Sequence, residues 1–170
     1  MREVDTSFTH YLKETFGIMN NLGVLLVSGN MNKFNVMTIG WGTAGIIWGK
    51  PVFCVLVRPS RYTYGLIEKN GEFTVNVPTP GMEEAVSFCG TVSGRNHDKF
   101  KEKNLTAIPG KKVKCPIIKE CSISYECQVV HKNDVVPGEL FSDIPPEYYL
   151  QGDYHRVYFG EILAVYKLRP

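Results

Sequence analysis

Six short runs of strand-forming residues, with only short helical segments between them, limit the folds that this chain can adopt. The runs cover residues 23–29, 34–40, 51–57, 72–77, 123–130 and 155–168. Parallel strands need a crossover of a dozen or more residues, usually a helix, at every connection. Because the chain has too few long helical segments for that, the pattern favours an antiparallel barrel over a doubly wound sheet. We therefore predict a mainly β fold, a β-barrel with short helices.

The length of the chain is that of one globular domain. Its 170 residues suffice for a core without disulfides or metals, so we expect a single domain over residues 1–170. Five apolar residues near the start follow helical spacing and predict an amphipathic N-terminal helix: Phe8, Tyr11, Leu12, Phe16 and Met19.

The charge and the cysteines bear on partners and location. A formal net charge of +2 gives no reason to expect nucleic acid or a charged membrane surface as a partner. No apolar run approaches the ~20 residues of a membrane span, and the first residues lack the plan of a signal peptide. The five cysteines form no CxxC pair, which disfavours zinc and dithiol redox chemistry, and Cys54 and Cys127 are expected to be small buried hydrophobes. We expect a cytoplasmic protein in a reducing compartment.

The turn after the run at 51–57 has the residue types of an anion site. It reads Arg58-Pro59-Ser60-Arg61-Tyr62-Thr63. Pro59 cannot continue a sheet ladder, Ser60 is a good N-cap, and the following helix should end at Gly71. Free N–H groups, two guanidiniums and hydroxyls at a helix start suit a phosphate monoester. An ordinary turn with solvated arginines explains the same residues, and the turn alone does not decide between the two.

A second turn of this kind joins two predicted helices, at residues 82–89 and 98–103. Ser93-Gly94-Arg95 offers backbone N–H groups, a hydroxyl and a cation, and Lys99 and Phe100 follow one turn later. Taken alone, the segment is more typical of a helix C-cap followed by a new N-cap than of a ligand site.

In combination, these segments resemble the FMN-binding split-barrel proteins of the flavin-reductase-like and flavoredoxin family. The matching motifs, in the same order and at similar spacing, are Asn35-Val36-Met37-Thr38 with Trp41, Pro51, the turn at 58–63, Gly71-Glu72-Phe73 with Val75-Asn76-Val77-Pro78, Ser93-Gly94-Arg95 with Asp98-Lys99-Phe100, and His155 with Gly160-Glu161. The resemblance implies a six-stranded antiparallel Greek-key split barrel that forms a homodimer. It also implies an FMN in each groove between the subunits.

The resemblance assigns candidate cofactor-binding residues. The strand residues Asn35, Val36, Met37 and Thr38 would lie along the isoalloxazine ring, with Trp41 lining the same slot. The turn residues Ser60, Arg61, Tyr62 and Thr63 would clamp the phosphate, with Arg58 nearby. The later residues Ser93, Gly94, Arg95, Lys99 and Phe100 would complete the phosphate and ribityl end. The residue types agree, because a phosphate needs charge-assisted donors and a flat apolar ring needs a slot beside a strand edge.

His155 is the candidate catalytic residue. The resemblance implies a role on the nicotinamide side of the flavin or in proton handling. However, Gly152-Asp153-Tyr154-His155 contains one residue more than the Gly-Asp-His pattern of the family. A strand-end histidine exposed to solvent is the alternative. The other histidines (His10, His97 and His131) share no metal spacing and are expected at the surface, and Trp48 is expected in the core.

Residues 132–154 have no apolar period and carry acidic and aromatic side chains, among them Tyr148, Tyr149 and Tyr154. We expect a loop that forms the outer wall of the flavin groove. A surface excursion packed on its own subunit is the alternative.

Three functions remain open from the sequence. We favour an NAD(P)H-dependent flavin reductase that uses FMN, with NADH or NADPH as reductant and free flavin as an acceptor. The alternatives are a flavoredoxin-like electron carrier that serves a redox protein, and a non-catalytic FMN-binding protein. No Gly-rich dinucleotide fingerprint follows a strand, but a nicotinamide stacked on flavin in an open groove needs none. No Ser-His-Asp or Cys-His spacing indicates hydrolysis.

Overall fold

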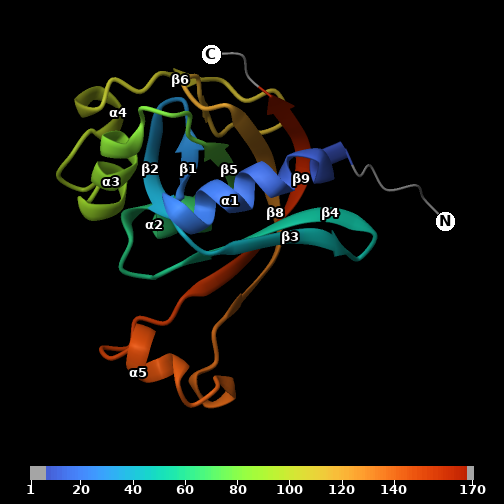
Figure 1. The fold of residues 1–170 in the computed structure, drawn as a ribbon, viewed down its shortest axis with the longest axis vertical. Helices are drawn as coiled ribbons and strands as arrows, with labels where there is room; N and C mark the ends of the chain where they lie inside the picture. The colour runs from blue at the N-terminus through green and yellow to red at the C-terminus, as the bar shows by residue number, and fades with distance from the viewer. Residues whose placement is uncertain (1–6, 168–170) are drawn as a thin grey trace.

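The computed structural model describes residues 7–167, and its main element is an antiparallel sheet of seven strands (Figure 1). These strands are β1 Val24–Asn30, β2 Lys33–Ile39, β3 Gly42–Ile47, β4 Lys50–Val57, β5 Glu72–Val77, β8 Ile123–Asp134 and β9 Arg156–Lys167. They lie in the order β2-β1-β5-β8-β9-β4-β3, and the short strands β6 Ala107–Ile108 and β7 Ile117–Ile118 pair separately. The predicted mainly β fold with short helices is confirmed.

The sheet curls into a barrel because its two edge strands are neighbours in the chain. β2 and β3 lie at opposite ends of the strand order, yet only Gly40 and Trp41 separate them. Three peptide links span at most about 11 Å, so these ends of the two edges must lie close together. Within residues 7–167, β2 and β3 do not pair with each other. The barrel is therefore split at this point.

Short helical segments precede and connect the strands. A 3-10 turn at Ser7–Tyr11 leads into α1 Leu12–Asn21, and α2 Tyr62–Asn70, α3 Glu83–Thr91, α4 Lys99–Glu102, a 3-10 turn at Pro137–Glu139 and α5 Ile144–Tyr148 follow. The N-terminal helix is confirmed, although residues 1–6 and residue 168 of the last predicted strand lie outside the described part. α2 ends at Gly71 as predicted, where a φ of 67° requires the left-handed region. In the span from 7 to 167, no helix is long and apolar enough to cross a membrane.

The sequence analysis missed β3, so six predicted strands become seven in the main sheet. Three glycines (Gly42, Gly45 and Gly49) made this stretch resemble a connection, but residues 42–47 form a ladder with β4. Trp48, which was expected in the core, lies where this hairpin reverses direction and is 62% exposed. Its ring contacts His131 of β8 and Phe159 of β9, at 5.6 and 5.9 Å between ring centres, on the outside of the sheet rather than in the core.

Strand β8 is more buried and longer than predicted. Residues 123–127 are all buried, rather than alternating between core and solvent. Glu126 is fully buried and accepts hydrogen bonds from the backbone N–H groups of Lys111, Lys112 and Val113. The loop before β7 thus covers the face of β8 that the alternation assigned to solvent. The strand also runs to Asp134, since it pairs with β9 beyond the barrel, where no apolar face is needed.

Two apolar clusters form the core. One fills the barrel and includes Phe53, Phe73 and Tyr125, and the other lies between the sheet and helices α3 and α4. All five cysteines lie in the described part, where they are buried and free. The burial predicted for Cys54 and Cys127 is therefore confirmed.

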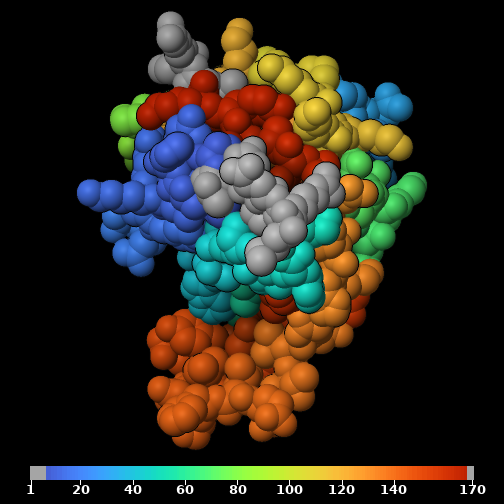
Figure 2. Space-filling model, turned by 90° about the vertical axis from the view of Figure 1, so that its right-hand side faces the viewer, coloured from blue at the N-terminus to red at the C-terminus, as the bar shows by residue number. Residues whose placement is uncertain are grey.

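Beyond the barrel, β8 and β9 form a ribbon that carries residues 135–154, which we call the arm. Figures 1 and 2 show the arm as a lobe that stands off the body of the molecule. At its base, the Arg156 guanidinium pairs with the carboxylates of Asp134, at 2.6 Å, and Glu68 of α2, at 3.2 Å. The Tyr158 hydroxyl also donates to Glu68, at 2.7 Å. These contacts join the base of the arm to α2.

Candidate functional site

Two cavities beside β2 share residues and form one groove at the split in the barrel. The first, of about 320 Å³, is bounded by β2, the start of α2 and the loop between α3 and α4; we call it the cationic cavity. The second, of about 160 Å³, is bounded by the β2–β3 link, the end of β4 and His155; we call it the aromatic cavity. Met37, Thr38 and Arg61 line both cavities. The turn at 58–63 therefore lies between the two halves of the groove.

Three basic side chains and no carboxylate line the cationic cavity. Arg61, Arg95 and Lys99 contribute the charges, and Thr63 and Ser93 contribute hydroxyls. Within residues 7–167, Arg61 forms no ion pair with a carboxylate. A guanidinium without a carboxylate partner, facing a concave wall of donors, suits an anionic ligand.

Carbonyl oxygens hold the other two cations in place. Arg95 Nη1 donates to the carbonyl of Ser60 at 3.0 Å, and its guanidinium lies 5.6 Å from the ring centre of Tyr62. Lys99 is only 4% exposed, and its Nζ donates to the carbonyl of Cys89 at 2.7 Å. Burial lowers the pKa of Lys99 below its ordinary value, and Arg61 acts in the same direction. Because an ammonium has three donors, Lys99 retains capacity for a ligand.

Gly94 allows the loop after α3 to close against β2. A Cβ at this position would overlap Oδ1 of Asn35 and the ring of Tyr62. Asn35 is itself buried, and its Nδ2 donates to Oγ1 of Thr63 at 2.9 Å. This close approach joins β2, the start of α2 and the loop after α3 into one wall.

Arg58 and Ser60 contact the arm. The Arg58 guanidinium donates to three carbonyl oxygens of the arm, the shortest bond being 2.7 Å. Both the backbone N–H and the hydroxyl of Ser60 donate to the Asp153 carboxylate, at 3.2 and 2.5 Å. The predicted N-cap at Ser60 is therefore wrong: Arg61 occupies the N-cap position of α2, and no side chain caps the helix. The Ser60 hydroxyl is already used by the arm.

Rings from three segments meet at the aromatic cavity. The Trp41 ring centre lies 5.0 Å from that of Tyr148 and 5.2 Å from that of His155. His155 is only 8% exposed, which excludes the solvent-exposed alternative. Burial lowers the pKa of His155 to about 4, and nearby Arg58 acts in the same direction. The imidazole is therefore neutral at physiological pH.

The structure brings most of the predicted residues to the groove. Those that line it are Asn35, Met37, Thr38, Trp41, Arg58, Ser60, Arg61, Tyr62, Thr63, Ser93, Gly94, Arg95, Lys99 and His155. The side chains of Val36 and Phe100 lie instead in the apolar core. Alternation along β2 turns Val36 to the opposite face of the strand. Phe100 packs edge-on against Phe34, at 4.8 Å between ring centres.

Tyr149 and Asp153 contact residues of the groove through partners that the sequence analysis did not identify. Asp153 bonds Ser60, which lies 93 positions earlier in the chain. Tyr149 places its hydroxyl 2.7 Å from His155 Nδ1. The acidic and aromatic composition of residues 132–154 indicated a loop with a role, but no local signal identifies partners so distant in sequence.

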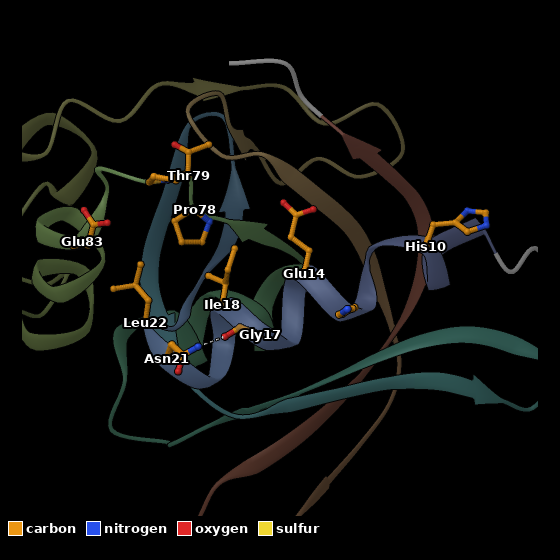
Figure 3. Close-up of a pocket in the computed structure, with 11 residues that line it drawn as sticks. His10, Glu14, Gly17, Ile18, Asn21, Leu22, Pro78, Thr79 and Glu83 are labelled. Carbon is orange, nitrogen blue, oxygen red and sulfur yellow. Dashed lines mark hydrogen bonds between the residues drawn. The ribbon is translucent and has the colours of Figure 1, made fainter.

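A larger cavity, of about 640 Å³, lies away from the groove, between α1 and residues 78–83. Figure 3 shows Ile18 of α1 and Leu22, which follows the helix, near Pro78, and the carboxylates of Glu14 and Glu83 also line the cavity. No predicted site residue lines this cavity, and its one lysine, Lys13, is outnumbered by the carboxylates of Glu14 and Glu83, which disfavours a phosphate. The groove beside β2 is therefore the candidate site.

Comparison with known sequences identifies the family of this chain. The model of the flavin reductase like domain matches residues 19–169. A protein of Archaeoglobus fulgidus is 38% identical over 141 residues, which cover 83% of this chain and 69% of that protein. A protein of Pyrococcus abyssi is 36% identical over 117 residues, which cover 69% of this chain and 66% of that protein. The chain thus spans about two thirds of the length of these relatives.

Solved structures give the same result. The flavoredoxin of Methanosarcina acetivorans is 31% identical with a TM-score of 0.67, and the match covers 86% of this chain and 68% of that one. The flavoredoxin of Desulfovibrio vulgaris (Miyazaki F) is 26% identical with a TM-score of 0.66, covering 85% and 68% of the two chains. Because the family model matches most of the sequence, the chain belongs to the flavin-reductase-like domain family.

Proposed function

We propose that this protein is an FMN-binding oxidoreductase whose cofactor lies in the groove beside β2. The observation that supports the proposal most directly is the cationic cavity, which is lined by three basic side chains and by hydroxyls, among them those of Thr63 and Ser93, without a carboxylate. The aromatic cavity continues from it past Met37 and Thr38. A ligand with a phosphate at one end and a planar ring at the other requires this arrangement of donors and walls.

The residues of the groove divide into two roles. Arg61, Thr63 and Ser93 would bind the phosphate, and Arg95 and Lys99 would add positive charge around it. The Asn35 side chain is committed to Thr63, so backbone groups of residues 35–38 would meet the polar edge of the ring. FMN, when bound, supplies hydride and single-electron transfer, and the protein supplies binding, orientation and a tuned electrostatic environment.

The test of this proposal is the affinity for FMN of the parent protein and of Arg61→Ala. The variant should bind FMN about one to two decades more weakly, since a hydrogen bond to a charged group contributes about 1.5–3 kcal/mol. Its affinity for riboflavin, which has no phosphate, should stay unchanged. Lys69→Ala, which removes an exposed charge from the other end of α2, is the matched control. Equal FMN affinity of Arg61→Ala and the parent would place the phosphate elsewhere, and a parent that takes up no FMN at micromolar concentration would refute the proposal.

We further infer that NADH or NADPH reduces the bound flavin. Trp41 is 41% exposed beside the aromatic cavity, which supports access by a second planar molecule. The second candidate is an electron carrier, favoured by 31% identity to a flavoredoxin. Anaerobic stopped-flow absorbance separates the two. Rapid bleaching of the flavin band by a nicotinamide nucleotide supports the reductase, whereas rapid bleaching only by a ferredoxin-type donor supports the carrier.

We also propose that the protein forms a homodimer, in which a second copy completes the groove. Large apolar side chains are exposed on two projecting elements. Trp48 and Ile46 are 62% and 49% exposed on the β3–β4 hairpin, and Phe141 and Leu150 are 78% and 82% exposed on the arm. Large apolar side chains exposed on projecting elements favour an interface over a free surface, and twofold pairing of identical copies is the common solution.

A further inference from the structure

A buried hydrogen bond links the arm to the histidine of the groove. Tyr149 follows α5, is 7% exposed, and places its hydroxyl 2.7 Å from Nδ1 of His155, which is 8% exposed. The two rings meet edge to face, with 5.5 Å between their centres. Neither residue contributes to the core of the barrel. The contact therefore requires an explanation other than packing.

Both partners of this hydrogen bond are uncharged at neutral pH. Burial raises the pKa of the Tyr149 phenol, so the hydroxyl keeps its proton at neutral pH. Burial lowers the pKa of His155 to about 4, so the imidazole is neutral and has one acceptor nitrogen. Two neutral arrangements fit the contact: the phenol donates to Nδ1 with the imidazole proton on Nε2, or Nδ1–H donates to the phenol oxygen. Within residues 7–167, Nε2 has no hydrogen-bond partner, and His155 lines the aromatic cavity.

We propose that Tyr149 is a positioning residue, which fixes His155 as a neutral Nε2–H donor for an acceptor oxygen in the aromatic cavity. This inference rests on the proposed function, and it names a chemical class for the molecule that exchanges electrons with the flavin: one with a carbonyl or amide oxygen near its reactive centre. A neutral imidazole of this kind binds and orients such an oxygen. It stays uncharged at neutral pH, so the proposal assigns it to orientation in place of the proton-handling role considered from the sequence.

The charged groups around His155 act mainly to keep its imidazole uncharged. Arg58, at the end of β4, and Arg61, before α2, both disfavour an imidazolium, whereas Asp153 of the arm favours it. The Arg58 guanidinium also lies 5.0 Å from the ring centre of Tyr149 and bonds three carbonyls of the arm. The phenol is therefore fixed at its ring face and at the backbone that carries it. Tautomer control then depends on the arm being in place.

Nitrogen NMR of the four histidines tests the proposal directly, because it reports protonation and tautomer without any flavin present. In the parent, the His155 ring should show a protonated Nε2 and an unprotonated Nδ1, unchanged from about pH 5 to pH 8. In Tyr149→Phe, the loss of a donor to the neutral form should raise the pKa of His155 from about 4 toward about 5 and mix the tautomers. Tyr154→Phe is the matched control, since Tyr154 stacks on Tyr149 but its hydroxyl makes no hydrogen bond within residues 7–167. A protonated Nδ1 in the parent, or an identical ring in Tyr149→Phe, would overturn the proposal.

A kinetic measurement on the flavin-loaded protein completes the test. Tyr149→Phe should keep FMN affinity within about threefold, because the phenol lies outside both cavities. It should raise KM for a carbonyl-bearing electron donor such as a nicotinamide nucleotide about tenfold, the scale of one hydrogen bond. An unchanged KM with an altered tautomer would remove the role assigned to His155. If the parent binds no FMN, the proposed function is wrong. The NMR measurement of the His155 tautomer needs no flavin, so it tests the role of Tyr149 independently.

Discussion

At the scale of single residues, burial of His155 makes stability depend on pH. The ordinary pKa of a histidine is 6.5, and the folded protein lowers that of His155 to about 4. Between these values the unfolded chain binds more protons than the folded one, so the free energy of unfolding falls as the pH decreases from about 6.5 toward about 4. At 1.36 kcal/mol per pKa unit, the loss should reach about 2–3 kcal/mol near pH 4. Urea unfolding at about pH 6.5 and at about pH 4 measures this loss of stability.

Carboxylates titrate in the same pH range, so the loss of stability due to His155 must be separated from theirs. It is the difference between the acid-induced stability losses of the parent and of His155→Gln. The variant should lose less stability on acidification than the parent does. His10→Gln, at an exposed position of the N-terminal turn, should behave as the parent. Parallel pH curves for the parent and His155→Gln would contradict the assignment.

At the scale of elements, the arm is attached to the barrel near the groove through a small set of polar contacts. Arg58 bonds three of its carbonyls, and Ser60 bonds Asp153. In Arg58→Ala, amide hydrogen exchange of residues 140–154 should accelerate at least about tenfold, since hydrogen bonds to a charged group are lost. Exchange in β1 and β5, which lie in the middle of the sheet, should not change. The control is Lys132→Ala, which removes an exposed ion pair between β8 of the ribbon and Glu68 of α2. Equal exchange rates of residues 140–154 in both variants would show that Arg58 does not hold the arm.

At the scale of the whole molecule, the exposed apolar side chains of the β3–β4 hairpin and the arm should be covered by a second copy. Light scattering should give twice the 19.2 kDa of one chain. Trp48→Lys or Leu150→Asp should shift the protein toward the monomer, because each buries a charge in the proposed interface. Met31→Lys, at an exposed apolar position in the β1–β2 turn, should not. A mass of one chain at every working concentration would contradict the dimer and leave the groove without a second wall.

The sequence by itself determined the features that depend on neighbouring residues. Alternation and β-branched content located most of the strands, because each strand must present one or both faces to a core. Gly71 ended α2 where a left-handed residue was required. The turn at 58–63 and the turn at 93–95 also contribute cations to one cavity, as the family resemblance implied. The strand or helix beside each turn determines its position.

Only the tertiary structure decided the features that depend on distant partners. Glu126 occupies a buried site because three backbone N–H groups of the loop before β7 satisfy it. Ser60 bonds Asp153 instead of capping α2, and Tyr149 rather than solvent meets His155. In each case local preferences of about 1 kcal/mol were outweighed by hydrogen bonds that form only when segments remote in the sequence come into contact. No short stretch of sequence identifies such contacts, because both partners are placed by the fold.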